Sequence, residues 1–95
     1  MRKPHPLQAE LIVEVAYTSI KQDREQAAEY AGARVPEYWI IDTNGRMVEV
    51  YRRPIADSEA PFGYRYAEMR VLKVGDQIAP ENRPNAATPV AMFFA

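Results

Sequence analysis

A single carboxylate interrupts an otherwise apolar stretch near the start of the chain. Glu14 lies within LIVEVA, in residues 10–16, which their apolar and β-branched composition predicts to form a strand. Because side chains alternate along a strand, Glu14 shares a face with Ile12 and Ala16. An ionised carboxylate among such neighbours is costly unless it is hydrogen-bonded, paired or bound to a metal. Glu14 is therefore either a residue at an open sheet edge or paired with an arginine, or it is a metal ligand or general base.

The other residues capable of chemistry have simpler interpretations. His5, the only histidine, lies between two prolines and has no second histidine with which to form a metal site. Arg46, Arg52 and Arg53 could contact phosphate, although three arginines on a chain with a net charge of −1 more often form a solvated face. The chain has no cysteine, which excludes thiolate metal sites, and it has no glycine-rich phosphate loop or HExxH motif.

The composition predicts one small folded domain. The chain has 95 residues, of which 47% are hydrophobic and 26% charged, and a chain of this length buries only a modest core. The net charge of −1 argues against a broadly basic surface that coats nucleic acid. Glu10 and Glu14 interrupt the apolar region that a signal peptide would need, and no segment resembles a membrane span. We therefore expect a cytoplasmic protein.

The spacing of apolar and small residues predicts one main helix after this strand. Such residues recur at helical spacing within residues 22–34, and the helix must end before Pro36. Either Ser19 or Asp23 is expected to cap its first turn. The apolar stripe consists of small side chains, which predicts close packing on a sheet.

A β-hairpin is predicted over about residues 37–52, with strands at 37–42 and 46–52. The dipeptide Asn44-Gly45 separates the two β-rich runs. Both central positions of a type I′ turn need a positive φ, which asparagine and glycine tolerate. A further strand at about 63–72 would complete a mixed sheet in an α/β fold.

The two ends of the chain differ from this central part. Residues 1–8 contain two prolines and are expected to form a flexible leader before a domain at residues 9–95. The proline-rich segment 79–89 is expected to be irregular. The last residues, PVAMFFA, are expected to form either one helical turn or an extended tail.

The order of these elements, and the short motifs within them, are similar to a known family. A strand containing VEV is followed by a helix, then by PEYWIID and VEVYR, with a Gly-Asp pair further on. This pattern resembles the Uma-two family of predicted restriction endonucleases, from about residue 8 to the C-terminus. The matching positions are Val13-Glu14-Val15, Ser19, Asp23, Tyr30-Ala31, Val35 to Trp39, Asp42, Val48 to Arg52 and Gly75-Asp76.

The resemblance implies a PD-(D/E)xK nuclease-like fold and metal-dependent cleavage of DNA. In that chemistry two carboxylates hold Mg²⁺ or Mn²⁺, which activates water and stabilises charge on the scissile phosphate, while a lysine orients the nucleophile. Glu14 matches the second carboxylate of the family and would be a metal ligand. Lys21 and Arg24 are the nearest candidates for the basic residue, although neither is in register. We predict Glu14 and Lys21 as the catalytic residues.

The chain departs from the family pattern at three places. The first carboxylate of the family, an aspartate on an earlier strand, would lie upstream of this sequence. Ala16 stands where an ExK motif has its lysine, and Gln26 stands near the position from which family members draw a basic residue on the helix. We therefore expect only the C-terminal portion of the family fold, with residues 9–95 forming a single partial, truncated restriction-endonuclease-like domain.

A truncated sheet would leave the edge of strand 10–16 unpaired, and such edges pair readily with another chain. We expect a homodimer, or a protein partner that supplies the missing half of the fold, with DNA as a possible ligand. Two functions remain open. The chain is a DNA endonuclease-like domain whose site is completed by another segment or chain, or it is a non-catalytic remnant that acts as an oligomerisation or protein-binding module. A second carboxylate near Glu14 would favour the first.

Overall fold

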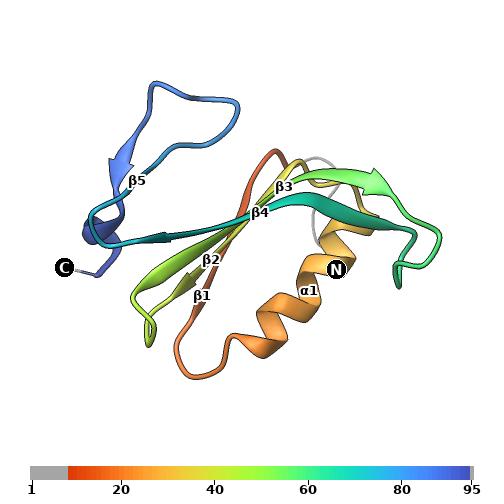
Figure 1. The fold of residues 1–95 in the computed structure, drawn as a ribbon, viewed down its shortest axis with the longest axis horizontal. Helices are drawn as coiled ribbons and strands as arrows, with labels where there is room; N and C mark the ends of the chain where they lie inside the picture. The colour runs from red at the N-terminus through yellow and green to blue at the C-terminus, as the bar shows by residue number, and fades with distance from the viewer. Residues whose placement is uncertain (1–8, 95) are drawn as a thin grey trace, which may run out of the picture.

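A four-stranded mixed sheet forms the centre of the structure (Figure 1), a computed structural model that describes residues 9–94. The strands are β1 (Ile12–Ala16), β2 (Glu37–Asp42), β3 (Met47–Ala56) and β4 (Tyr64–Lys73), in this order across the sheet. β1 runs parallel to β2, whereas β2, β3 and β4 are antiparallel to one another. The predicted mixed sheet, with its hairpin and its first strand, is confirmed.

The helix α1 (Lys21–Gly32) connects β1 to β2 and covers one face of the sheet (Figure 1). It agrees with the helix predicted at residues 22–34. Ala27 and Ala31 are buried against the sheet, and their short side chains let the helix backbone approach the strands closely. The expectation of a small, closely packed apolar stripe is therefore confirmed.

The start of α1 differs from the prediction. Ile20 occupies the N-cap position and makes no side-chain capping bond, while Asp23 lies inside the first turn. Asp23 cannot act as the N-cap, because that position requires a residue just outside the helix. Ser19 Oγ accepts a hydrogen bond from the backbone N–H of Lys21 at 3.3 Å, so this hydroxyl satisfies one of the free amides at the helix start.

Four tyrosine rings lie in a row between α1 and the sheet. The ring centroids of Tyr30 and Tyr38 are 4.9 Å apart, those of Tyr38 and Tyr51 are 5.8 Å apart, and those of Tyr51 and Tyr66 are 5.9 Å apart. Tilted aromatic pairs at these separations add to the stabilisation from area burial. This tyrosine row crosses the helix-covered face from α1 through β2 and β3 to β4.

The C-terminal segment covers the opposite face of the sheet (Figure 1). It contains a short two-stranded sheet, β5 (Gln77–Ile78) with β6 (Thr88–Pro89), and a 3₁₀ helix, η2 (Val90–Phe94). The expected irregular segment is confirmed apart from β6, and of the two expected end conformations the helical turn is the one present. The buried core on this face consists of Trp39, Ile41, Val48, Val50, Ile78 and Val90.

The turn between β2 and β3 is not the predicted type I′ turn. The last cross-strand pair is Asp42 with Met47, which leaves a four-residue loop at 43–46. The positive φ in this loop belongs to Arg46, at 51°, and not to Asn44 or Gly45. The prediction fails because Asp42 Oδ1 accepts a hydrogen bond from the backbone N–H of Gly45 at 3.0 Å, an interaction that favours the longer loop.

Two further expectations concern the chain ends and the membrane. The predicted leader at residues 1–8, with His5, lies outside the described residues. Between residues 9 and 94, no helix combines the length and the apolar composition that crossing a bilayer would require.

Candidate functional site

Glu14 points from β1 toward α1, into the layer between helix and sheet. Within the described residues β1 pairs only with β2, so Glu14 lies on an edge strand. Tyr30 Oη donates a hydrogen bond to Glu14 Oε2 at 3.2 Å. No ion pair joins Glu14 to an arginine in residues 9–94. An arginine was one of the partners expected for Glu14, but the partner in the structure is the hydroxyl of Tyr30.

Asp23, from the first turn of α1, carries a second carboxylate into the same region. Tyr38 Oη donates a hydrogen bond to the backbone carbonyl oxygen of Asp23 at 2.9 Å, which ties this turn to β2. Burial, and after it the charge of Glu14, raises the pKa of Asp23. The two carboxylates are therefore close enough to repel each other electrostatically. We refer to Glu14 and Asp23 as the carboxylate pair.

The tyrosines beside the carboxylate pair are held in their protonated form. Burial raises the pKa of Tyr38, and the negative charges of Asp23 and Glu14 raise it further. Burial also raises the pKa of Tyr30, with the charge of Glu14 as the next cause. Both hydroxyls therefore remain hydrogen-bond donors at neutral pH, and they orient the helix and one carboxylate without neutralising the negative charge.

The carboxylate pair matches part of what a divalent metal ion needs. Mg²⁺ commonly takes one or two carboxylates from a protein and completes its octahedral shell with water and substrate phosphate. Repulsion between Glu14 and Asp23, which contributes to the raised pKa of Asp23, is the kind of interaction that a bound cation relieves. In the part of the chain that the structure describes, no group of three or more His, Cys, Asp or Glu side chains could hold a metal ion. Glu14 and Asp23 can thus supply two ligands but not a complete protein cage.

The two candidate basic residues occupy different environments. Lys21 is the first residue of α1 and is exposed; no hydrogen bond or ion pair connects its side chain to Glu14 among residues 9–94. Arg24 points instead toward Glu49 on β3. Arg24 is therefore committed to another partner, and the catalytic role of Lys21 remains a prediction.

Glu49 is a buried carboxylate with a full set of partners. Its side chain is only 1% exposed, and Arg24 Nε lies 3.1 Å from Glu49 Oε1 and 3.0 Å from Oε2. Arg24 Nη2 also contacts Oε2, and Tyr51 Oη donates a hydrogen bond to Oε1 at 2.7 Å. Burial alone would raise the pKa of Glu49, but the hydrogen bonds from Arg24 and Tyr51 and the charge of Arg24 outweigh burial and lower it. Glu49 is thus a structural anion that fastens α1 to β3.

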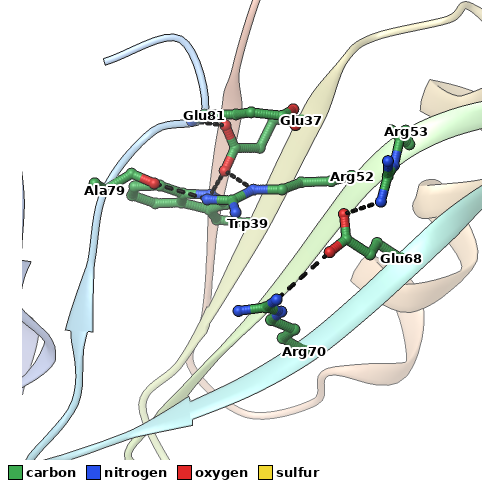
Figure 2. Close-up of polar contacts among 8 residues, drawn as sticks. All are labelled: Glu37, Trp39, Arg52, Arg53, Glu68, Arg70, Ala79 and Glu81. Carbon is green, nitrogen blue, oxygen red and sulfur yellow. Dashed lines mark hydrogen bonds and ion pairs between the residues drawn. The ribbon is translucent and has the colours of Figure 1, made fainter. Parts of the chain in front are cut away.

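Glu37 connects the sheet to the C-terminal segment on the other face (Figure 2). Its buried carboxylate accepts hydrogen bonds from Trp39 Nε1, from Arg52 Nε and from the backbone N–H of Glu81, each at 2.7 Å. Arg52 Nη2 in turn donates to the backbone carbonyl oxygen of Ala79 at 2.7 Å. Strands β2 and β3 and the segment that follows β5 therefore meet at one carboxylate.

The three hairpin arginines do not form one phosphate-binding cluster. Arg52 is held inside the Glu37 network (Figure 2), whereas Arg53 pairs with Glu68 at 3.2 Å. Arg46 lies in the turn at the start of β3, with its guanidinium 5.5 Å from the ring centroid of Phe94. The three guanidinium groups therefore have separate partners: the carboxylate of Glu37, the carboxylate of Glu68 and the ring of Phe94.

Sequence reasoning identified Glu14 but missed the roles of Glu49 and Asp23. Glu49 lies between two valines in VEV, the same local pattern that drew attention to Glu14. The pattern could therefore have drawn attention to this buried carboxylate as well. Asp23 was expected as a candidate helix cap and as a position that matches the family pattern, because nothing in its local sequence indicates that α1 places it beside β1.

Comparison with known proteins adds one match. The model of the Uma2 family, described as "Putative restriction endonuclease", matches residues 2–89. No curated protein and no solved structure matches the chain significantly. Since the family model covers most of the chain, including β1, α1 and the hairpin, the chain belongs to the Uma2 family of restriction-endonuclease-like proteins.

Proposed function

We propose that this chain is a metal-dependent DNA endonuclease-like domain with Mg²⁺ or Mn²⁺ as its cofactor. Glu14 is one metal ligand and Asp23 is the second. The remaining part of the site comes from another segment or from another chain, because no group of three or more His, Cys, Asp or Glu side chains among the described residues could hold a metal ion.

One observation carries the proposal. The carboxylates of Glu14 and Asp23 come from different elements, β1 and α1, and the charge of Glu14 adds to burial in raising the pKa of Asp23. Such repulsion between two half-buried carboxylates costs stability, and it is common where a site is arranged to bind a cation. Glu49 provides the contrast, since Arg24 neutralises it within the fold.

Each residue of the site has a defined task. When bound, a divalent metal would activate water and stabilise charge on the scissile phosphate. Glu14 and Asp23 present carboxylate oxygens, and Tyr30 orients Glu14 by its hydrogen bond at 3.2 Å. Tyr38 keeps the first turn of α1 in place through the carbonyl of Asp23. Lys21, exposed at the start of the same helix, supplies positive charge to the substrate phosphate.

Calorimetric titration of the chain with Mn²⁺ and with Mg²⁺ tests the proposal. We expect binding tighter than about millimolar in the wild type, and at least about tenfold weaker binding in Glu14→Gln and in Asp23→Asn, since each variant removes one charged ligand. Glu25→Gln is the matched control, because Glu25 is an exposed carboxylate on the same helix.

The outcomes separate clearly. Equal weak binding by the wild type, Glu14→Gln and Asp23→Asn would overturn the metal site. Loss of binding in Glu14→Gln but not in Asp23→Asn would overturn the assignment of Asp23 alone. If the metal binds as expected, Lys21→Gln should retain metal binding and lose cleavage of a supercoiled plasmid.

A second candidate function rests on the edge of β1. Val13 and Val15 lie on the strand face opposite Glu14 and are 44% and 43% exposed. Exposed apolar edge strands pair readily with other chains. On this proposal the chain forms a homodimer through β1, or docks there on a protein that completes the fold, without catalysing a reaction.

Sedimentation equilibrium tests this second candidate. We expect the mass of a dimer for the wild type and of a monomer for Val15→Lys. The control is Val71→Lys, which places the same charge at a valine on β4 that is 41% exposed. A monomeric wild type would exclude dimerisation through β1.

A further inference from the structure

A pocket lies between α1 and β4, on the face of the sheet that also carries the carboxylate pair. It has a volume of about 250 Å³ and is mainly apolar. Strand β4 extends beyond the cover of α1 (Figure 1), and the short side chains of the helix leave space above the strand. The residues that matter here are Ala27, Ala28, Tyr51, Tyr64, Tyr66 and Met69, which we call the tyrosine pocket.

The walls of the tyrosine pocket offer aromatic surface and almost no free hydroxyl donor. Tyr51 Oη donates to Glu49 at 2.7 Å, and Tyr66 Oη donates to the backbone carbonyl oxygen of Val35 at 2.8 Å. Tyr64 Oη accepts a hydrogen bond from Arg34 Nη1 at 3.3 Å. A ligand in this pocket is therefore recognised by contact with rings and methyl groups, not by hydrogen bonds to hydroxyls. A dry apolar cavity of about 150 Å³ holds benzene, so this one has room for a larger planar ring system.

Arg34 does not line the tyrosine pocket but places a positive charge against Tyr64, which forms one of its walls. Its guanidinium lies 5.4 Å from the ring centroid of Tyr64, and it forms no ion pair with a carboxylate in the described part of the chain. Arg65, the arginine that lines the pocket itself, is paired with Asp57 at 3.0 Å. Arg34 also has a φ of 58°, a backbone conformation that costs less for glycine than for arginine. A cation without a carboxylate partner among the described residues thus lies against the outer side of one tyrosine of the pocket, at a backbone position that is strained for arginine.

We propose that the tyrosine pocket binds one unstacked nucleobase of a DNA strand, with the adjoining phosphate at Arg34. A nucleotide combines a planar ring with a neighbouring negative charge, and this combination matches aromatic walls with a cation against the outer side of one of them. Bases stack on aromatic side chains largely without regard to sequence, which agrees with a pocket whose hydroxyls are already bonded within the protein. The inference rests on the proposed action on DNA, and it names the part of the substrate that this face holds.

The tyrosine row links the two sites. Tyr30 contacts Glu14 at one end of the row, and Tyr66 lines the pocket at the other end. Because α1 covers the middle of the row, where Tyr38 is 0% exposed, a DNA strand that places one base in the pocket lies outside this layer, and the row connects the two sites only through the interior of the protein. The pocket holds the strand, while any metal chemistry takes place at the other end of the row.

Fluorescence anisotropy with two labelled oligonucleotides tests the proposal. One is octathymidylate, and the other is an eight-residue abasic strand with the same backbone charge. In EDTA at low salt, we expect the wild type to bind octathymidylate at least about tenfold more tightly, because stacking of one base contributes roughly this factor. Ala28→Leu, which fills the pocket, should abolish the difference. Gln22→Leu, the same side chain at an exposed position of α1, should preserve it.

Arg34→Gly tests the charge against Tyr64. Because glycine relieves the strained backbone, this variant should fold, and it should weaken binding of both oligonucleotides by the same factor. Equal affinity of the wild type for the two strands, no binding to either, or an unchanged preference in Ala28→Leu would each overturn the proposal.

The test is independent of the metal site. The preference for bases should survive in Glu14→Gln, since the assay contains no metal. A preference for bases without metal binding would overturn the proposed endonuclease function but support the base-binding pocket. Metal binding without a preference for bases would support the metal site but overturn the pocket.

Discussion

Glu14 and Glu49 stand in one row across the sheet, separated only by Ile40, and both reach toward α1. Their backbones are about 10 Å apart, the spacing of two strand intervals. Their partners differ. Glu49 meets the guanidinium of Arg24 and the hydroxyl of Tyr51, whereas Glu14 meets only a tyrosine hydroxyl among the described residues. The fold thus gives one carboxylate a cationic partner within the described residues and leaves the other without one.

The buried ion pair of Glu49 predicts that a nearly isosteric substitution at this residue destabilises the fold. Glu49→Gln preserves the shape of the side chain but removes its charge-assisted hydrogen bonds. We expect a loss of about 1.5–3 kcal/mol in the free energy of unfolding, measured by urea denaturation. Glu68→Gln, which disturbs a pair with the largely exposed Arg53, should cost less than about 1 kcal/mol. Similar losses in both variants would contradict the structural role of Glu49.

The same pair predicts a dependence of stability on pH. The pKa of Glu49 is lower in the folded state than its ordinary value of 4.5. Its ionisation therefore stabilises the fold above that value, and this stabilisation is lost as the pH falls through the lowered pKa. The difference in unfolding free energy between wild type and Glu49→Gln should be largest at neutral pH and shrink below pH 4.5. A difference that stays constant from pH 7 to pH 3 would show that charge is not its source.

The Glu37 network predicts a local effect on the C-terminal segment. Removing the carboxylate in Glu37→Ala leaves Arg52, Trp39 and the amide of Glu81 without their acceptor. Breaking a buried pair of this kind costs about 3–5 kcal/mol. Amide hydrogen exchange should accelerate first in the segment after β5, because this segment is fastened to the sheet there. Glu81→Gln is the control, since only the backbone N–H of this residue joins the network.

The positive φ of Arg34, just after the end of α1, predicts that stability depends on the backbone preference of the residue at this position. Arg34 N–H and Val35 N–H donate hydrogen bonds to the carbonyls of Ala31 and Tyr30, at 2.9 and 3.0 Å, with Arg34 at a φ of 58°. Arg34→Gly and Arg34→Ala both lose the contact with Tyr64, but only glycine is unstrained. We expect Arg34→Gly to be more stable than Arg34→Ala by about 1 kcal/mol in thermal or urea unfolding. Equal stabilities would mean that the left-handed conformation costs nothing here.

Local sequence signals were sufficient to predict the helix and the strands of the main sheet, but not the short strands β5 and β6. Apolar and β-branched runs predicted β1 and the hairpin strands, and helical spacing before Pro36 predicted α1. The type I′ turn predicted from Asn44-Gly45 is wrong, because the hydrogen bond from Gly45 N–H to the side chain of Asp42 favours a longer loop. Turn type depends on such side-chain contacts as well as on the tolerance of each residue for a positive φ.

The sequence by itself determined that Glu14 is an unusual residue, because alternation along a strand places its charge among apolar neighbours. Only the tertiary structure decided which groups meet it. The packing of α1 on the sheet brings Asp23 and Tyr30 to Glu14, and the strand register places Glu49 in the same row with a different partner. These contacts join residues distant in sequence, so they follow from the register of the strands and from the close approach that buried alanines give the helix, neither of which a local pattern specifies.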